Sequence, residues 1–245
     1  MCLMVAGFFL LLALIMPVSA DLTKIKPGGV VFIGEQGLDI SSAVGDYHTL
    51  AWWPSGSSVS SNPPAQVIDI SSMNKNSFYI DPSLFSYTGS WYAYNDVQPS
   101  SSTTPAFILE DPSIGIKIWD LDTNLDSSGR SVLQGDPLSF RIDTNLYKAL
   151  DPSYRQNINS ATDGIITIKV KTDGGVLLDS LYDTSSTTHT LVNQYVDTQS
   201  WTWGGSTVTS WGTGSMDSQN QYRYPAGTYV VWAESTLNNM KNNYK

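Results

Sequence analysis

Two stretches of strict apolar–polar alternation constrain the fold of this chain more than any other feature. The apolar residues fall at every second position, first at Ile114, Ile116 and Ile118 and then at Leu138, Phe140 and Ile142. A two-residue period is typical of a β-strand that has one face on a core and the other in water. The sequence therefore predicts a pair of half-buried strands with a polar loop between them.

The remainder of the chain also favours short strands. Brief apolar runs are bounded by turn residues, and Asp173-Gly-Gly175 follows the alternating run 166–171 as a strong hairpin signal. Serine, threonine, glycine and aromatic residues are plentiful, which is a β composition. We therefore predict an all-β chain made of one or two immunoglobulin-like β-sandwich units in tandem, at 21–111 and 112–245.

Residues 1–20 differ in composition from the rest of the chain. Residues 7–16 are almost wholly apolar and small residues lead up to Ala20, which is the pattern of a secretory signal peptide cleaved after Ala20. The sole cysteine, Cys2, lies in this segment, so the mature chain is expected to contain no disulfide. No later apolar stretch approaches the length of a membrane span. We therefore expect a secreted protein with no membrane span in its mature part.

The charge and the missing motifs exclude several functional classes. The formal net charge is −9, and an acidic chain is a poor partner for nucleic acid or an anionic membrane. The sequence has no G-x-S-x-G elbow and no glycine-rich phosphate loop, and His48 and His189 are far apart. We therefore expect no catalytic residues. A secreted hydrolase is the weakest alternative, because it needs a cleft with carboxylates of perturbed pKa.

The loop between the two alternating strands carries oxygen ligands at alternate positions, which are Asp120, Asp122, Asn124 and Asp126. Calcium takes six to eight oxygen ligands, and such a run can wrap around one ion. The loop departs from an EF-hand at the sixth position, which is Leu125, and at the twelfth, which is Ser131. Two interpretations stay open, a calcium site and a solvated acidic turn, because Asp and Asn are also good turn residues.

Tryptophan is unusually frequent, and two indoles lie in a glycine- and serine-rich setting near the end of the chain. Trp203 and Trp211 are candidates for exposed platforms that stack on sugars or anchor a protein interface. The alternative is that β-sheet cores simply use aromatic residues.

The opening segment, 27–40, contains V-F-I-G-E-x-G-L-D-I, which is not a generic β pattern. Further distinctive segments are Trp52-Trp53, Phe78–Pro82, Gly89–Tyr92, Asp111–Ser113, Ile118–Asp120, Gly129–Val132, Gly135-Asp136, Phe140–Leu146 and Pro225–Ser235. Together these segments resemble a family of uncharacterised domains in surface proteins of methanogenic archaea, and the resemblance covers nearly all of 21–245. It implies an exported cell-envelope protein of the surface-layer or sheath type, with no catalytic residues to transfer.

Larger relatives in that family carry repeats or a C-terminal membrane anchor, and this sequence has neither. We therefore expect either that the protein assembles sideways into a coat without its own anchor or that the sequence is truncated. The expected partners are other copies of the chain and other envelope proteins. Strand edges at Val30–Ile33 and Tyr229–Ala233 are the predicted contacts, with Val31 and Val231 as the residues to test. The alternative function is an extracellular carbohydrate-binding module that uses exposed tryptophan.

Overall fold

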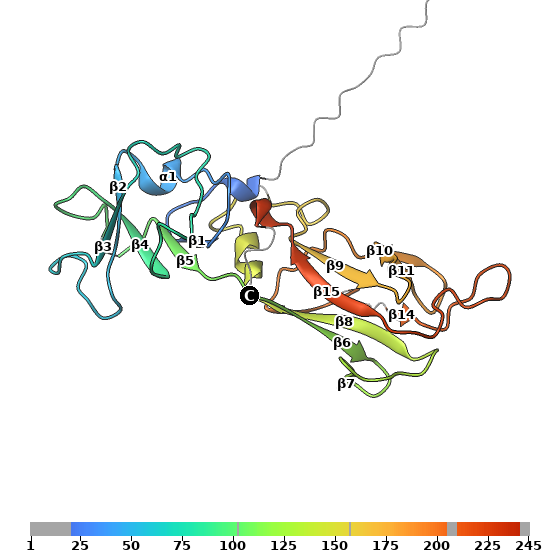
Figure 1. The fold of residues 1–245 in the computed structure, drawn as a ribbon. Coiled ribbons are helices and arrows are strands. Elements are labelled where there is room, and N and C mark those ends of the chain that lie inside the picture. The colour runs from blue at the N-terminus through green and yellow to red at the C-terminus, as the bar shows by residue number, and fades with distance from the viewer. Residues whose placement is uncertain (1–20, 102, 157, 205–209, 241–245) are drawn as a thin grey trace, which may run out of the picture.

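The structure is a computed structural model that describes residues 21–101, 103–156, 158–204 and 210–240. The predicted signal peptide, 1–20, lies outside the described residues. Nearly all of the regular elements are β-strands, so the prediction of an all-β fold is confirmed (Figure 1). The immunoglobulin-like topology stays a prediction. Within the described ranges no helix has the length and apolar character needed to cross a membrane.

The first unit is built on one five-stranded sheet. Its strand order is β1 (Gly29–Phe32), β5 (Phe107–Glu110), β4 (Gly89–Tyr94), β2 (Thr49–Trp52) and β3 (Gln66–Asp69). The pair β1–β5 is parallel and the other pairs are antiparallel. A core that includes Leu50, Phe78 and Trp91 packs on this sheet, and the short helix α1 (Ser41–Val44) contributes to it. β1 and β3 are therefore the two edges of the first sheet.

The second unit contains the two strands predicted from alternation. They are β6 (Ile114–Asp120) and β8 (Pro137–Thr144), and their register places Ile116 opposite Ile142 and Ile118 opposite Phe140. The rest of this sheet comprises β13 (Ser200–Thr202) and β14 (Trp211–Gly212) on β8 and β7 (Leu125–Asp126) on β6. The inward side chains of both strands lie on one core, as a two-residue period requires.

The facing layer of the second unit consists of two smaller sheets. One has the order β10 (Leu177–Leu178), β9 (Ile166–Lys171) and β15 (Val230–Ser235), and the other pairs β11 (Ser180–Tyr182) with β12 (Thr188–Thr190). Side chains from both layers form the buried core, among them Phe140, Ile168 and Trp203. This unit is a β-sandwich in which β6 lies against β15 along one side.

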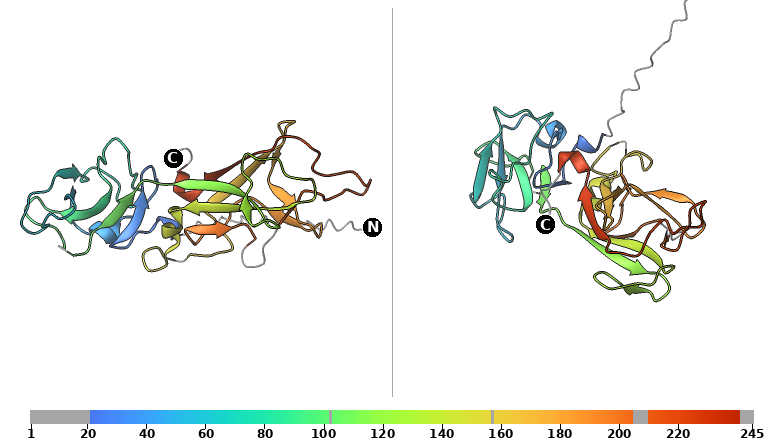
Figure 2. Two further views of the ribbon diagram at one scale, coloured as in Figure 1. Left: turned by 90° about the horizontal axis from the view of Figure 1, so that it is seen from below. Right: turned by 45° about the vertical axis from the view of Figure 1, so that its right-hand side comes forward.

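The two units have separate cores and lie end to end (Figure 2). The chain passes from one to the other between β5, which ends at Glu110, and β6, which begins at Ile114. Leu22 and Phe32 are exceptions, because they belong to the core cluster of the second unit although they precede the first unit's other strands. Three short 3₁₀-helices complete the described elements: η1 (Asp21–Thr23), η2 (Leu146–Leu150) and η3 (Leu237–Asn239).

Candidate functional site

A buried ion pair joins the two units. Arg155 follows η2 in the second unit, and Glu35 follows β1 in the first. The two side chains meet in a bidentate geometry, with Nη1–Oε1 at 2.5 Å and Nη2–Oε2 at 3.0 Å. Their exposed fractions are 1% for Arg155 and 0% for Glu35. The pair therefore forms a dry contact between segments far apart in the sequence.

Further hydrogen bonds tie the termini of the described chain to this pair. Arg155 Nη1 donates to the Leu22 carbonyl at 2.6 Å, and Asn238 Nδ2 donates to Glu35 Oε1 at 2.8 Å. The Gln36 amide also donates to the Asn238 carbonyl at 3.0 Å. Four segments, two near the N-terminal end of the described chain, one in its middle and one near its C-terminal end, thus converge on one carboxylate and one guanidinium. We call this set of residues (Leu22, Glu35, Arg155 and Asn238) the junction.

The junction was not foreseen from the sequence. Glu35 stood out only as part of the opening segment of the resemblance, and Arg155 lies in a polar stretch without apolar alternation. The scarcity of glutamate was a usable signal, because a chain with three glutamates that places one beside a glycine turn is a candidate for a specific role. The identity of its partner depends on tertiary contacts that a local pattern does not contain.

The junction closes one of the two edges that were predicted to be free. On the open side of β1, Arg155 Nη2 donates to the Val30 carbonyl at 2.8 Å and the Phe32 amide donates to Glu35 Oε2 at 3.0 Å. Val31 is 0% exposed. The prediction that Val31 lies in an available contact edge is therefore wrong, since its side chain is in the core and its neighbours' polar groups are bound.

The second predicted edge, β15, has no strand paired along its outer side, although Ala233 and Ser235 are buried and β6 lies close beside it. β15 pairs only with β9 among the described strands. The Ile168 amide donates to the Leu191 carbonyl, away from β15, so Ile168 and its partner Ala233 form a non-hydrogen-bonded pair. The backbone groups of Val231 and Ala233 consequently point away from β9. Val231 thus lies on an unpaired edge with its side chain partly buried against the core, and its role as a contact residue stays a prediction.

The acidic loop forms a tight turn of the β6–β7 hairpin. Register places Asp120 opposite Leu125 and Asp126 opposite Trp119, so the two carboxylates point to opposite faces of the hairpin. Asp120 Oδ1 accepts from the Asp122 and Thr123 amides at 2.9 and 3.1 Å, and Asp126 Oδ1 accepts from the Ser128 amide at 2.9 Å. These hydrogen bonds lower the pKa of both carboxyls.

Asn124 is the one asparagine of the predicted calcium set. Its Oδ1 accepts a hydrogen bond from Trp119 Nε1 at 3.0 Å, and its backbone φ is 56°. Asp122 contributes its backbone amide to the turn. Across the described residues no group of three or more His, Cys, Asp or Glu side chains is placed to hold a metal. Asp120, Asp122, Asn124 and Asp126 are therefore arranged as turn residues and are not brought together around a common centre.

The two candidate platforms are inside the sandwich. Trp203 is 1% exposed and Trp211 is 3% exposed, and both pack on Phe140. The prediction of exposed stacking faces at these positions is wrong, because both indoles fill the space between the two layers of the sandwich. Trp203 Nε1 donates to the Thr190 carbonyl at 3.1 Å, whereas Trp211 Nε1 is buried without a partner in the described chain.

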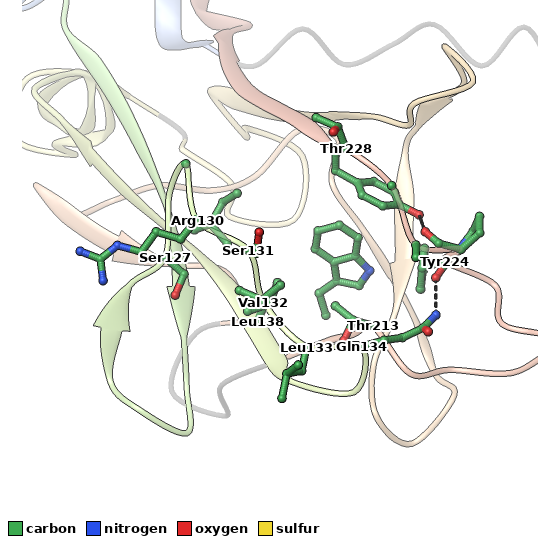
Figure 3. A pocket seen from close by; sticks show the side chains of 17 residues that line it. Ser127, Arg130, Ser131, Val132, Leu133, Gln134, Leu138, Thr213, Tyr224 and Thr228 are labelled. Carbon is green, nitrogen blue, oxygen red and sulfur yellow. Dashed lines mark hydrogen bonds between the residues drawn. The ribbon is translucent and has the colours of Figure 1, made fainter.

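A hollow of about 500 Å³ lies beside Trp211 at the end of the sandwich (Figure 3). One wall is the loop after β7, which includes Ser131 and Val132, and the other is the segment before β15, which includes Tyr224, Thr228 and Tyr229. No Asp or Glu is among the described residues that line it. Burial raises the pKa of the Tyr224 and Tyr229 phenols, so both rings stay neutral at ordinary pH.

An acidic hollow lies at the far end of the first sheet and was not predicted. It has a volume of about 310 Å³, and Asp46, His48 and Asp96 line it. Neither the Asp46 nor the Asp96 carboxylate has a hydrogen bond or ion pair within the described ranges. Asp69 on β3 lies directly across β2 from this hollow, in the row that contains Thr49 and Tyr94. We call Asp46, Asp69 and Asp96 the acidic end.

Comparison with known families gives one match. A family model described as a domain of unknown function (DUF3821) matches residues 27–242. The chain belongs to the DUF3821 family. No curated protein matches the chain.

The DUF3821 match runs through both units and includes Glu35, Arg155 and Asn238. Three of the four junction residues therefore lie within the DUF3821 region, Leu22 lies just before it, and that region in this chain spans both units rather than either sheet alone.

Proposed function

We propose that this DUF3821 protein is a secreted, non-enzymatic structural subunit of an archaeal cell envelope, of the surface-layer or sheath type, which associates laterally with copies of itself. The observation that carries the proposal is the open edge of β15, whose Val231 and Ala233 backbone groups face away from the sheet. An unpaired edge is a template for another strand, and many backbone hydrogen bonds form at once when it is filled.

The junction supports the same proposal. A bidentate Arg–carboxylate pair buried between two units restricts their relative movement, because any rotation would break charge-assisted hydrogen bonds in a dry site. A stiff two-unit subunit suits a lattice, since each contact then fixes the orientation of the next copy. Enzymes that close on a substrate need a hinge at such a place instead.

Electron microscopy of residues 21–245 tests the proposal. Sheets, hoops or tubes at raised protein concentration are the expected result, with discrete particles at low concentration. Discrete monomers under every condition of concentration, calcium and salt would overturn it. A parallel sample with a chelator separates an assembly that depends on calcium from one that depends on strand pairing alone.

A second candidate function, an extracellular carbohydrate-binding module, has one observation in its favour. Trp211 lines the hollow, and the Ser131 and Thr228 hydroxyls on its walls make no hydrogen bond within the described chain (Figure 3). A neutral sugar supplies both acceptors and an apolar face. A glycan array tests this, with binding lost in a Ser131→Ala, Thr228→Val variant. No binding by the unaltered protein would dismiss it.

A further inference from the structure

We propose that the open edge of β15 in one copy pairs with the edge of β3 in the next copy, so that the subunits join head to tail. The inference rests on the proposed self-association and names the two surfaces that carry it. It follows from the lengths of the available edges, from the direction of their backbone groups, and from the charges beside them.

Length selects these two strands among the edges of the described sheets. β7 and β10 have two residues each, and β13 has three. β11 and β12, which form a separate pair, have three each. β3 has four residues and β15 has six, while the four-residue β1 is closed by the junction. A longer edge offers more hydrogen bonds to a partner, so β15 is the strongest template, followed by β3 and the unpaired four-residue part of β6, Ile114–Lys117.

The backbone of β3 presents free groups, as β15 does. The Ile70 amide donates to the His48 carbonyl on β2, so the even-numbered positions of β3 bind β2. The amides and carbonyls of Val67 and Asp69 consequently face outward. Val67 also exposes 45% of its surface, which leaves an aliphatic side chain free to pack on a partner.

The side of the sandwich next to β15 has a matching apolar surface. β6 lies against β15 there without pairing with it, and Ile114, Ile116 and Val231 are only partly buried against the core. Within the described chain, no strand pairs with the outer edge of β15 or with the edge of β6 over Ile114–Lys117.

The net charges beside the two edges are opposite, with Lys169 and Lys171 outnumbering Glu234 at β15 and three aspartates outnumbering Lys75 at β3, which favours head-to-tail pairing over like-with-like pairing. Lys169 and Lys171 lie on β9 opposite Trp232 and Val230, and neither is in an ion pair within the described ranges. The acidic end beside β3 carries the unpaired Asp46 and Asp96 carboxylates, although Lys75 is near, bound to the Tyr47 carbonyl at 2.6 Å. Two copies of β3 would bring like charges together, and a heterologous contact that does not close gives an open array.

Two edge variants test the pairing in the full chain. Val67→Pro removes an outward amide of β3, and Val231→Pro removes one of β15, without breaking either internal ladder. Each variant alone is expected to lose arrays and to sediment as a monomer. An equimolar mixture is expected to give 1:1 dimers and nothing larger, because one variant still offers β15 and the other still offers β3.

The alternatives give different results. Dimers of either variant alone would indicate like-with-like pairing and overturn the inference, as would arrays from Val67→Pro alone. In both cases the unaltered protein still assembles, so the proposed function stands. An unaltered protein that never assembles overturns both. If a proline variant does not fold, the charge-reversal variant Lys169→Glu, Lys171→Glu replaces it. This variant is expected to lose the arrays alone and to regain them when it is mixed with the variant Asp46→Lys, Asp96→Lys. Arrays that are unchanged by the charge reversal refute the pairing.

Discussion

At the scale of single residues, the junction is the most constrained part of the molecule. Glu35 accepts three kinds of donor, which are the Arg155 guanidinium, the Asn238 amide and the Phe32 backbone. Arg155 Nε alone remains without a partner. A buried pair of this kind contributes modestly when intact, but removal of one partner leaves an uncompensated charge in a dry site.

Arg155→Met should therefore destabilise the protein by about 3–5 kcal/mol, because Glu35 stays buried without its counter-ion. Urea unfolding followed by tryptophan fluorescence measures the change. The matched control is Lys117→Met, which breaks an ion pair with Asp143 whose side chains are 47% and 43% exposed, and should cost no more than about 1 kcal/mol. Equal losses in the two variants would contradict the role assigned to burial.

A second residue-scale prediction concerns the loop between β11 and β12. Hydrogen bonds from Ser185, then His189 and the Thr187 amide, hold the pKa of Asp183 well below its usual range. A carboxyl with a depressed folded pKa stabilises the fold above its unfolded pKa, and that contribution disappears as pH falls toward the folded value. Asp183→Asn should thus lower the melting temperature at pH 7, with the difference from the unaltered protein shrinking below about pH 4. Melting curves that differ equally at pH 7 and pH 2 would refute this.

At the scale of elements, β15 shows how the two sides of one strand differ. Trp232 pairs with Lys169 through hydrogen bonds, whereas Val231 directs its amide outward. Alternate residues of β15 therefore form the backbone hydrogen bonds to β9, and the backbone groups of the residues between them have no partner strand.

Proline substitution distinguishes the two sides. Val231→Pro should leave the protein folded, because no ladder hydrogen bond is lost. Trp232→Pro should destabilise it by several kcal/mol, since it removes a ladder donor and a side chain whose Nε1 donates to Glu234 at 2.7 Å. Circular dichroism and thermal melts of both variants measure the contrast, and a Val231→Pro variant that is as unstable as Trp232→Pro would show that the assignment of the amides is reversed.

Elements were predictable from the sequence where the pattern is local. β6, β8 and β9 follow from alternation, because the side-chain period of a strand is written in neighbouring residues. Burial of Trp203 and Trp211 was not predictable, since their glycine-rich surroundings resemble a surface loop and only the facing sheet decides their exposure. The junction was hidden for the same reason, because Glu35 and Arg155 meet only after both units have formed.

At the scale of the whole molecule, the two cores are connected through the junction, the Glu110–Ile114 connection, the Lys148–Glu110 ion pair, the backbone bridge between Ile25 and Arg155, and the shared packing of Leu22 and Phe32. Each unit is large enough to hold a core of its own, so the coupling between them rests on few residues.

Calorimetry should show this coupling directly. The unaltered protein is expected to unfold in one transition, and Arg155→Met is expected to split that transition in two, because the units then lose the contact that makes them cooperate. The control is again Lys117→Met, which lies within the second unit and should keep a single transition. Two transitions in the unaltered protein would contradict the coupling.

The closure of β1 by Arg155 also sets an order in time. A chain is made from its N-terminus, and the first sheet is complete once Glu110 has been added. The Val30 carbonyl on its β1 edge has no partner at that moment, because the guanidinium that binds it belongs to a later part of the chain. Every newly made molecule thus passes through an interval in which its first unit is folded but can still pair with another strand, and the speed of synthesis limits how long that interval lasts.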